Sequence, residues 1–164
     1  MADPRTVSDD LRRYVEDLAL FYEAAGLPRI AGRILGLLLV CEPPHRTAAQ
    51  LIEELGASKA SVSQMTRLLV SAGLIERFAQ RGERASYFRI RDDGFETLFE
   101  REIATIRGFG PIADRGLALL GPEAGDRGSR LRALRALYRF FEEAMPDLID
   151  RWRRERDERI ANED

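Results

Sequence analysis

The sequence has very few of the residues that covalent or metal cross-links require. It contains one cysteine and one histidine in 164 residues. A single cysteine excludes an internal disulfide framework, and the two residues together are too few for a zinc finger or another Cys/His metal site. We therefore expect no metal and no cofactor. Packing alone should hold the core, and a chain of this length can bury enough surface for that.

Long hydrophobic runs are also missing. The longest apolar run, Ile34 to Cys41, has eight residues and includes Gly36, whereas about 20 apolar residues are needed to span a bilayer. The N-terminus is polar and acidic, unlike a secretory signal. These features predict a soluble cytoplasmic protein that does not enter the membrane.

Signatures of catalysis are scarce as well. There is no glycine-rich phosphate loop and no Gly-x-Ser-x-Gly motif, and His45 is the only histidine that could pair with a nucleophile. Acidic side chains are numerous but scattered over predicted helix surfaces, where solvation is their expected role. The sequence therefore predicts a protein that is not an enzyme and has no catalytic residues.

Charge is nearly balanced overall but uneven along the chain. The 26 basic and 28 acidic side chains give a formal net charge of −2. Residues 57–91 hold seven basic and two acidic side chains, a net +5, whereas residues 1–56 carry −3 and residues 92–164 carry −4. Arginine is used throughout, with Lys59 the single lysine, so only the location of the positive segment is informative. It points to an anionic partner for residues 57–91.

Helical periodicity dominates the first third of the chain. Thr6 and Ser8 are candidate N-caps of a helix that ends at Gly26. Pro28 is expected as the first residue of a second helix, which runs to about Cys41 and is apolar nearly all round. Such a helix is predicted to lie at the centre of the core.

A helix-turn-helix followed by a hairpin comes next. Thr47 and Gln50 form a capping-box pattern that opens a short helix ending at Gly56. Ser58 is the predicted N-cap of another helix, which ends at Ala72 before Gly73. Strands are predicted over residues 74–78 and 85–90, with a glycine-bearing turn over residues 81–83. This order of elements is typical of a winged helix.

The remainder is predicted to be helical. One helix should run from about Gly94 to Arg107 and break at Gly108, Gly110 and Pro111. After a short apolar segment over residues 112–120, Ser129 is expected to cap a long final helix. Its highly charged tail, from Arg153 onward, is expected to fray. The predicted fold class is mainly α with a small β-hairpin wing.

The helix after Ser58 has the two faces that a DNA-recognition helix needs. The predicted inner face consists of Val62, Met65, Leu68, Leu69 and Ala72. The opposite face carries donors suited to base edges and phosphates, namely Lys59, Ala60, Ser63, Gln64 and Arg67. Ser58 and Ser61, near the helix start, either cap it or contact a phosphate. The alternative is an ordinary polar surface helix.

The hairpin tip is the second candidate contact. It carries Arg81, Gly82 and Arg84, and a narrow minor groove attracts inserted arginine. The alternative is a solvated β-turn.

These residues resemble a known family. The stretch from Phe21 to Phe99 is similar to the winged-helix domain of MarR-type transcriptional regulators, most of all to their GbsR-like branch. The matching text is Gly26-Leu-Pro28, Ala31-Gly32-Arg33, Ser58-Lys59-x-x-Val62-Ser63, Gly73-Leu74-Ile75 and Gly82-Glu83-Arg84-x-x-Tyr87-Phe88. The usual MarR wing has an Asp-x-Arg motif, whereas Glu83 and Arg84 stand there without that spacing.

The resemblance implies a homodimer on a pseudo-palindromic operator. Residues 1–27 would form an N-terminal dimerisation helix, residues 28–92 the winged helix-turn-helix, and residues 93–164 a C-terminal helical dimerisation region. Residues 58–67 would take the recognition role, and Arg81 and Arg84 the wing role. We expect a sequence-specific regulator of transcription that acts as a repressor. The alternative is a winged-helix protein–protein docking module.

Relatives of this type also respond to small molecules, so an effector is a further expectation. A choline-like cation would need an aromatic cage, and candidate rings are Tyr14, Phe21, Tyr22, Phe109, Tyr138, Phe140, Phe141 and Trp152. Aromatic residues at helical spacing are more often core or dimer seam, and no ligand residue is assigned. Cys41 could serve as a redox-sensing thiol, but a free cysteine is more often buried and inert. His45 is expected in a loop.

Overall fold

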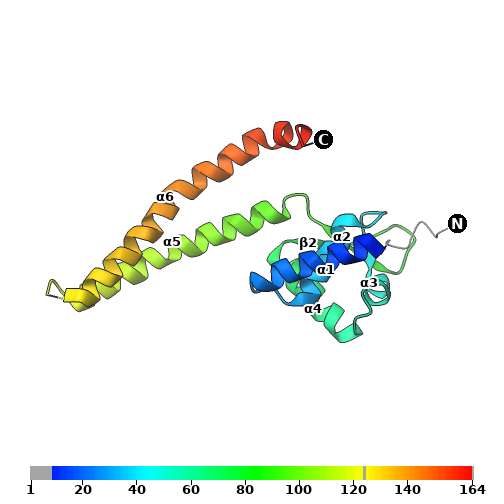
Figure 1. Cartoon of the computed structure of the whole chain (residues 1–164), viewed down its shortest axis with the longest axis horizontal. Helices are drawn as coiled ribbons and strands as arrows, with labels where there is room; N and C mark the ends of the chain where they lie inside the picture. Colours follow the sequence, from blue (N-terminus) through cyan, green and yellow to red (C-terminus); the bar gives the residue numbers. More distant parts are fainter. Residues whose placement is uncertain (1–8, 124, 164) are drawn as a thin grey trace. The chain divides into compact units, whose positions relative to one another are not determined.

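The structure, a computed structural model, describes residues 9–123 and 125–163. It is mainly helical (Figure 1), as the sequence predicts, and its small sheet contains the predicted hairpin and one further strand. The chain forms two compact units, residues 1–95 and 96–164. The elements are α1 (Asp9–Ala24), α2 (Arg29–Val40), β1 (Arg46–Thr47), α3 (Ala48–Leu55), α4 (Lys59–Ala72), β2 (Ile75–Ala79), β3 (Ser86–Ile90), α5 (Gly94–Leu120) and α6 (Gly125–Ala161).

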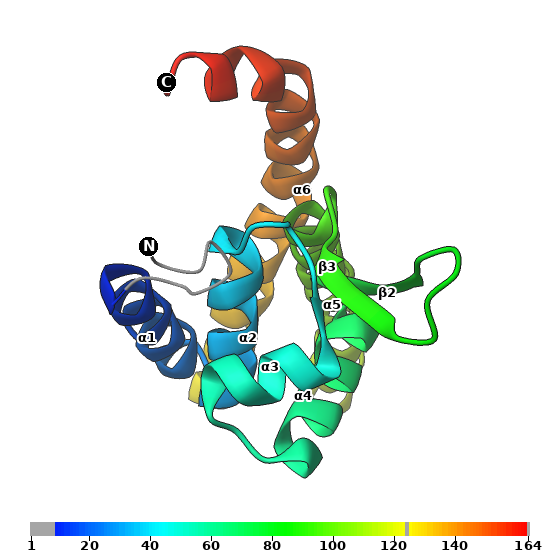
Figure 2. The same cartoon turned by 90° about the vertical axis from the view of Figure 1, so that its right-hand side faces the viewer.

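Helix α2 is the centre of the first unit. It lies between α1 and α4 (Figure 2) and also contacts α3 and β3. Its apolar side chains are almost fully buried, which confirms the prediction made from its all-round hydrophobicity. The exceptions are Leu39, which is 43 % exposed near the C-terminal end, and Ile30 and Val40, which are partly buried. Pro28 is the N-cap just outside the helix rather than its first residue.

Two glycines let α1 approach α2 closely. A Cβ atom added at Gly32 would lie 2.9 Å from the Cα of Ala19, and one at Gly36 would lie 3.3 Å from the Cα of Val15. Ala19 and Val15 are themselves buried. The two helices therefore meet backbone to backbone, where any larger side chain would push them apart. The predicted caps Thr6 and Ser8 lie outside the described residues.

The short helices α3 and α4 begin and end where the sequence predicts. Thr47 Oγ1 accepts a hydrogen bond from the backbone N–H of Gln50, and the Gln50 side chain accepts one from the backbone N–H of Thr47, which completes the capping box. Gly56 ends α3 with φ 58°. This left-handed conformation suits glycine and turns the chain sharply into α4.

The sheet has strand order β1-β3-β2, and all pairs are antiparallel. Strands β2 and β3 form the predicted hairpin, with Phe78 opposite Tyr87. Strand β1 was not predicted. It has only two residues, and it pairs with the central strand through Arg46 opposite Phe88 and Thr47 opposite Tyr87. The hairpin is thereby attached to the start of α3.

The predicted break at residues 108–111 is wrong, because α5 is continuous through Gly108, Gly110 and Pro111. Pro111 removes one hydrogen bond, to the carbonyl of Arg107, and both residues lie on an exposed side where water can replace it. Gly110 serves close packing instead, since a Cβ there would lie 3.0 Å from the Arg135 guanidinium on α6. Packing against the neighbouring helix outweighs the local helix-breaking propensity.

Helix α6 is longer at both ends than predicted. It begins at Gly125, so Ser129 lies inside the helix and its hydroxyl donates to the Gly125 carbonyl at 3.2 Å. The charged tail is helical to Ala161 rather than frayed. Ion pairs with α5 hold it, because Arg153 pairs with Glu100 and Arg156 Nη1 lies 3.2 Å from Glu96 Oε1.

We predict opposite stability effects for two glycine-to-alanine substitutions. Gly32→Ala should lower the free energy of unfolding by about 1–3 kcal/mol, because its Cβ would collide with the α1 backbone. Gly108→Ala should raise it by about 0.5–1 kcal/mol, because nothing lies within 4 Å of that Cβ and alanine favours the helix. Urea denaturation followed by circular dichroism measures both. Equal destabilisation of the two variants would contradict the close helix contact.

Candidate nucleic-acid interface

Local hydrogen bonds position the start of α4. Ser58 Oγ accepts from the backbone N–H of Ser61 at 3.1 Å, and its own hydroxyl donates to Ser61 Oγ at 2.9 Å. Ser58 is therefore the N-cap that the sequence predicts. At the other end Gly73 adopts φ 76° and closes the helix. Both ends of this helix are fixed without any contribution from its exposed face.

The two faces of α4 differ as predicted, except that Thr66 replaces Leu68 on the buried face. Val62, Met65 and Leu69 are buried. Thr66, which the sequence analysis missed, is buried with them, and its hydroxyl donates to the Val62 carbonyl at 2.8 Å. Leu68 was assigned to the inner face but is 38 % exposed. The opposite face is exposed and contains every predicted contact residue, namely Lys59, Ala60, Ser63, Gln64 and Arg67.

The β2–β3 hairpin presents a second set of exposed basic residues. Arg81, Gly82 and Arg84 are exposed at its tip, and Gly82 makes the turn with φ 88°. Neither arginine forms an ion pair within residues 9–123 and 125–163. Two unneutralised guanidinium groups at the end of a rigid ribbon are suited to phosphate oxygens.

An aromatic cluster supports the loop end of this hairpin, next to the turn. The Phe78 and Tyr87 rings stack with centroids 5.6 Å apart, and the His45 ring meets Tyr87 edge-on at 4.9 Å. His45 also lies 3.1 Å from the Gln80 side chain. The histidine occupies the loop that the sequence predicts, but the fold gives it a packing role that a lone histidine could not reveal.

Arg46 is a functional support that the sequence analysis missed. It is only 3 % exposed. Its guanidinium donates to Glu54 Oε1 at 2.6 Å and to the carbonyls of Pro43 and His45, each at 2.9 Å. These bonds compensate the buried charge and fix the loop that leads into α3. Nothing in the sequence separates this arginine from the exposed ones.

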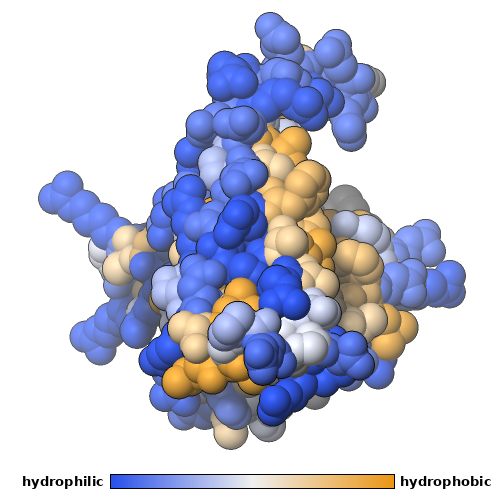
Figure 3. Space-filling model, turned by 90° about the vertical axis from the view of Figure 1, so that its left-hand side faces the viewer, coloured by the Kyte–Doolittle hydropathy of each residue, from blue (hydrophilic) through white to orange (hydrophobic). Residues whose placement is uncertain are grey.

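The second unit exposes a large apolar surface. Figure 3 shows apolar side chains gathered in a strip along the α5–α6 hairpin, beside a hydrophilic face. The α6 contributors with more than a third of their surface exposed are Leu134, Leu137, Phe140, Phe141, Leu148, Trp152 and Ile160. Exposed apolar patches of this extent mark interaction surfaces.

The rings considered for a cation cage meet in pairs. Phe109 and Tyr138 lie 4.1 Å apart between centroids, and Phe140 contacts Phe141 at 5.6 Å. Phe21 and Tyr22 form a third pair within α1. The Trp152 indole N–H donates to Glu96 instead, at 3.0 Å. These pairs support packing rather than an aromatic cage.

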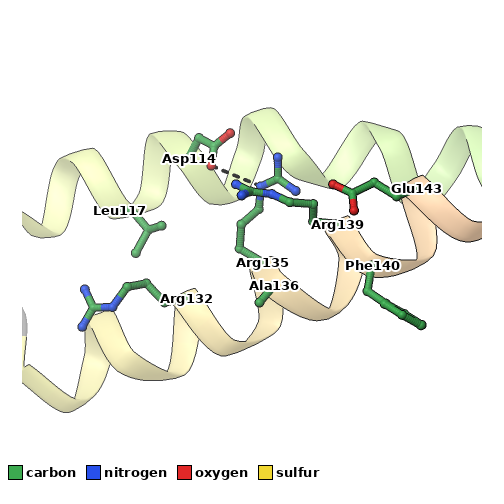
Figure 4. A pocket seen from close by; sticks show the side chains of 8 residues that line it. All are labelled: Asp114, Leu117, Arg132, Arg135, Ala136, Arg139, Phe140 and Glu143. Atoms are coloured by element: carbon green, nitrogen blue, oxygen red, sulfur yellow. Dashed lines mark hydrogen bonds and ion pairs between the residues drawn. The ribbon is translucent and has the colours of Figure 1, made fainter.

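A cavity of about 330 Å³ lies between α5 and α6 (Figure 4). Its lining is Asp114, Leu117, Arg132, Arg135, Ala136, Arg139, Phe140 and Glu143. Arg135 donates to Asp114 at 3.2 Å, which raises the pKa of Arg135. Five of the eight lining residues are charged, unlike the mostly apolar pockets that bind small molecules, so the cavity does not identify an effector.

Metal and membrane sites are absent from the part of the chain that the structure describes. Among residues 9–123 and 125–163, no group of three or more His, Cys, Asp or Glu side chains could hold a metal ion. Within the same ranges no helix has the length and apolar character to cross a bilayer.

Cys41 lies at the end of α2 and is 6 % exposed. Burial raises the pKa of its thiol, and the charge of Arg46 only partly opposes this effect. The sequence shows no basic residue within three positions of Cys41, so this neighbour is brought there by the fold. A raised pKa and a buried sulfur both make the thiol unreactive.

Together, a helix-turn-helix with an exposed polar second helix and a basic antiparallel wing define a winged-helix DNA-binding regulator. A family model described as the MarR family matches residues 25–85. A second model, described as an MmpR5-like MarR family transcriptional regulator, matches residues 93–155.

Individual proteins that are similar to this chain are also described as transcriptional regulators. The chain is 35 % identical over 150 residues to the HTH-type transcriptional regulator MmpR5 of Mycobacterium tuberculosis, covering 92 % of this chain and 91 % of that protein. It is 29 % identical over 84 residues to the HTH-type transcriptional repressor OpcR of Bacillus subtilis, covering 51 % of this chain and 45 % of that one. A crystal structure described as a transcriptional regulator is 35 % identical with a TM-score of 0.75, covering 88 % of this chain and 99 % of that one.

The chain therefore belongs to the MarR family of transcriptional regulators. Members of this family bind operator DNA and function as dimers. The protein is a DNA-binding regulator of transcription and not an enzyme.

We predict that Cys41 reacts slowly in the folded protein. At pH 7, a disulfide reagent such as DTNB should modify it at least about tenfold more slowly in the native chain than in guanidinium, because burial disfavours the thiolate. The release of thionitrobenzoate measures both rates. Equal rates in the two conditions would instead favour the sensing role.

Proposed function

We propose that this protein is a homodimeric repressor that binds a pseudo-palindromic operator. Helix α4 would lie in the major groove, and the β2–β3 wing would enter the flanking minor groove. The observation that carries the proposal is the exposed polar face of α4 next to a hairpin with two unpaired arginines. The proposed role operates where the chromosome is, in the cytoplasm.

The recognition role is assigned to Ser58, Lys59, Ala60, Ser61, Ser63, Gln64 and Arg67. Arg67 offers a bidentate donor to guanine, and Gln64 offers an amide to adenine. Ser58 and Ser61 already bond to each other, so their contribution is to hold the helix start close to a phosphate. The inner face is buried against α2 and α3, which leaves the outer face free for DNA.

The wing role is assigned to Arg81, Gly82 and Arg84. A hairpin whose strands pair over five residues each is stiff enough to insert its tip into a groove. Arginine side chains without an internal carboxylate partner keep their full charge for phosphates. The positive segment over residues 57–91 thus coincides with the two elements that would meet DNA.

Dimerisation is assigned to residues 1–27 and 93–164, with residues 28–92 as the DNA-binding domain. Support comes from exposed apolar side chains on the terminal helices. Phe21 on α1 is 66 % exposed, and Leu137 on α6 is 51 % exposed. Covering such surfaces with a second copy removes apolar area from water.

Repression and its relief by a small molecule complete the proposal. A related chain, OpcR, carries the description of a repressor, and the resemblance of the winged helix to the GbsR-like branch points the same way. The effector has no assigned residues. The alternative, a protein-docking winged helix, differs in its salt dependence, because only phosphate binding weakens linearly with the logarithm of salt concentration.

Selection from random duplexes tests the whole proposal. We expect enrichment of a pseudo-palindrome whose half-sites lie one helical turn apart, about 34–36 Å. The dimer's two α4 helices would then occupy successive major grooves. Failure to enrich any sequence would overturn sequence-specific binding and favour the docking alternative.

Arg67→Ala should weaken binding to the selected duplex by about 1–3 kcal/mol and relax preference at one base pair per half-site, because a guanine would lose its bidentate partner.

Arg81→Ala should weaken binding to all sequences alike and lower the salt slope by about 0.9 for each phosphate that is no longer neutralised. Fluorescence anisotropy over a series of salt concentrations measures both. A control is Arg12→Ala on α1. Unchanged binding by either test variant would remove that residue from the interface.

Leu134→Glu combined with Leu137→Glu should convert the dimer to a monomer, because two charges would have to be buried in the subunit contact. Both side chains are already more than 40 % exposed, so the helix itself should remain folded. Sedimentation velocity measures the association state, and Arg130→Gln on the same helix is the control. A double variant that stays dimeric would contradict the assignment of this strip.

A further inference from the structure

The arginines of the wing hairpin fall into two groups. Those on the strands have internal partners: Arg77 donates to Ser86 Oγ at 2.8 Å, and Arg89 pairs with Glu76 while lying 4.9 Å over the Phe78 ring. Arg81 and Arg84 at the tip have no ion pair in the described residues. Within the hairpin, Arg89 is therefore neutralised by a carboxylate and Arg77 is held by a neutral hydroxyl, whereas the tip arginines keep their charge.

An acidic residue, Glu83, lies between the two tip arginines in the sequence and could neutralise either of them. Glu83 directly precedes Arg84 and follows Arg81 by two positions. An exposed carboxylate that close to two guanidinium groups is available to form a surface ion pair with either of them. Each such pair would cancel one of the charges that the proposed wing brings to DNA.

Glu83 is instead engaged by Tyr87. The tyrosine hydroxyl donates a hydrogen bond to Glu83 Oε2. The same bond raises the pKa of Tyr87, since the phenol is held in its protonated, donating form beside a carboxylate. The carboxylate is thereby held against the first residues of β3 that follow the turn.

Tyr87 can hold the carboxylate because its own ring has little freedom to move. The residue is 8 % exposed in the central strand of the sheet. Phe78 stacks on the ring from β2, and the edge of His45 packs against it from the loop before β1. The position of the hydroxyl is therefore set by three separate segments of the chain.

We propose that Tyr87 is a positioning residue of the wing: its hydroxyl holds Glu83 away from Arg81 and Arg84, so that both arginines remain available to phosphates. The inference rests on the proposed DNA-binding role of the wing and adds a residue to it. Tyr87 itself does not contact DNA, since its ring is buried.

The test is Tyr87→Phe, which keeps the ring in the aromatic cluster and removes only the hydrogen bond. Glu83, once released, should pair with a tip arginine in each wing of the dimer. We expect binding to weaken by about eightfold for each wing at 0.1 M salt and the salt slope to fall by about 1.8 in total, since each neutralised phosphate contributes about 0.9. The probes are the selected duplex and a mixed-sequence duplex of the same length.

A second substitution separates positioning from general damage. In the double variant Tyr87→Phe/Glu83→Gln, the amide cannot neutralise an arginine, so affinity and salt slope should return to the wild-type values. Glu83→Gln alone should bind at least as tightly as wild type. Glu42→Gln, which removes an exposed carboxylate outside the wing, α4 and the proposed dimerisation regions, is the control. An unaltered Tyr87→Phe, or a double variant that binds no better than Tyr87→Phe, would overturn the proposal.

The hydrogen bond itself is measurable without DNA. Spectrophotometric titration of the phenols in the free protein should show two raised pKa values, because burial also raises the pKa of Tyr22. The raised pKa that belongs to Tyr87 should be lost in Tyr87→Phe and move down in Glu83→Gln. The absence of that shift would overturn the proposal whatever the DNA results. If no sequence is enriched in the selection, sequence-specific function fails, while the mixed-sequence duplex and this titration still decide the role of Tyr87.

Discussion

The burial of α2 is the constraint on which the rest of the first unit depends. Its side chains pack against α1, α3, α4 and β3, so the helix-turn-helix and the wing share one core. Gly32 and Gly36 allow α1 to close one side of that core by backbone contact. Since α4 buries Val62, Met65 and Leu69 on this core, its opposite face is exposed to solvent. The exposed polar face of α4 is thus a consequence of packing on the inside.

Polar groups inside the unit orient its elements relative to one another, whereas apolar packing supplies most of the stability. Arg46 directs its donors to Glu54 and to loop carbonyls, and Thr47 opens α3 with a capping box in the next position. The same two residues form β1 and attach the sheet to the helix-turn-helix. The wing and the helix-turn-helix are therefore connected through a few residues whose side chains are held by hydrogen bonds.

Much of the fold followed from local patterns. The caps at Thr47 and Ser58 and the turns at Gly56 and Gly73 are determined by neighbouring residues, so their positions were predicted correctly. The continuity of α5 through Pro111 was not predictable in this way, because contacts with α6 decide it. The exchange of Leu68 for Thr66 on the inner face of α4 has a similar origin. A threonine can be buried when its hydroxyl bonds to the preceding turn.

By itself the sequence determined the order of helix-turn-helix and hairpin, the location of the positive charge and most of the two faces of α4, since these depend on periodicity and on residues close together in the chain. Only the tertiary structure decided which charges are free. Arg46 and Arg89 look like Arg81 and Arg84 in the sequence, but each pairs with a carboxylate of another element or of the opposite strand. Glu83 likewise meets Tyr87 only after the hairpin closes. Partnership between charged groups depends on distances in space, and these are set by packing.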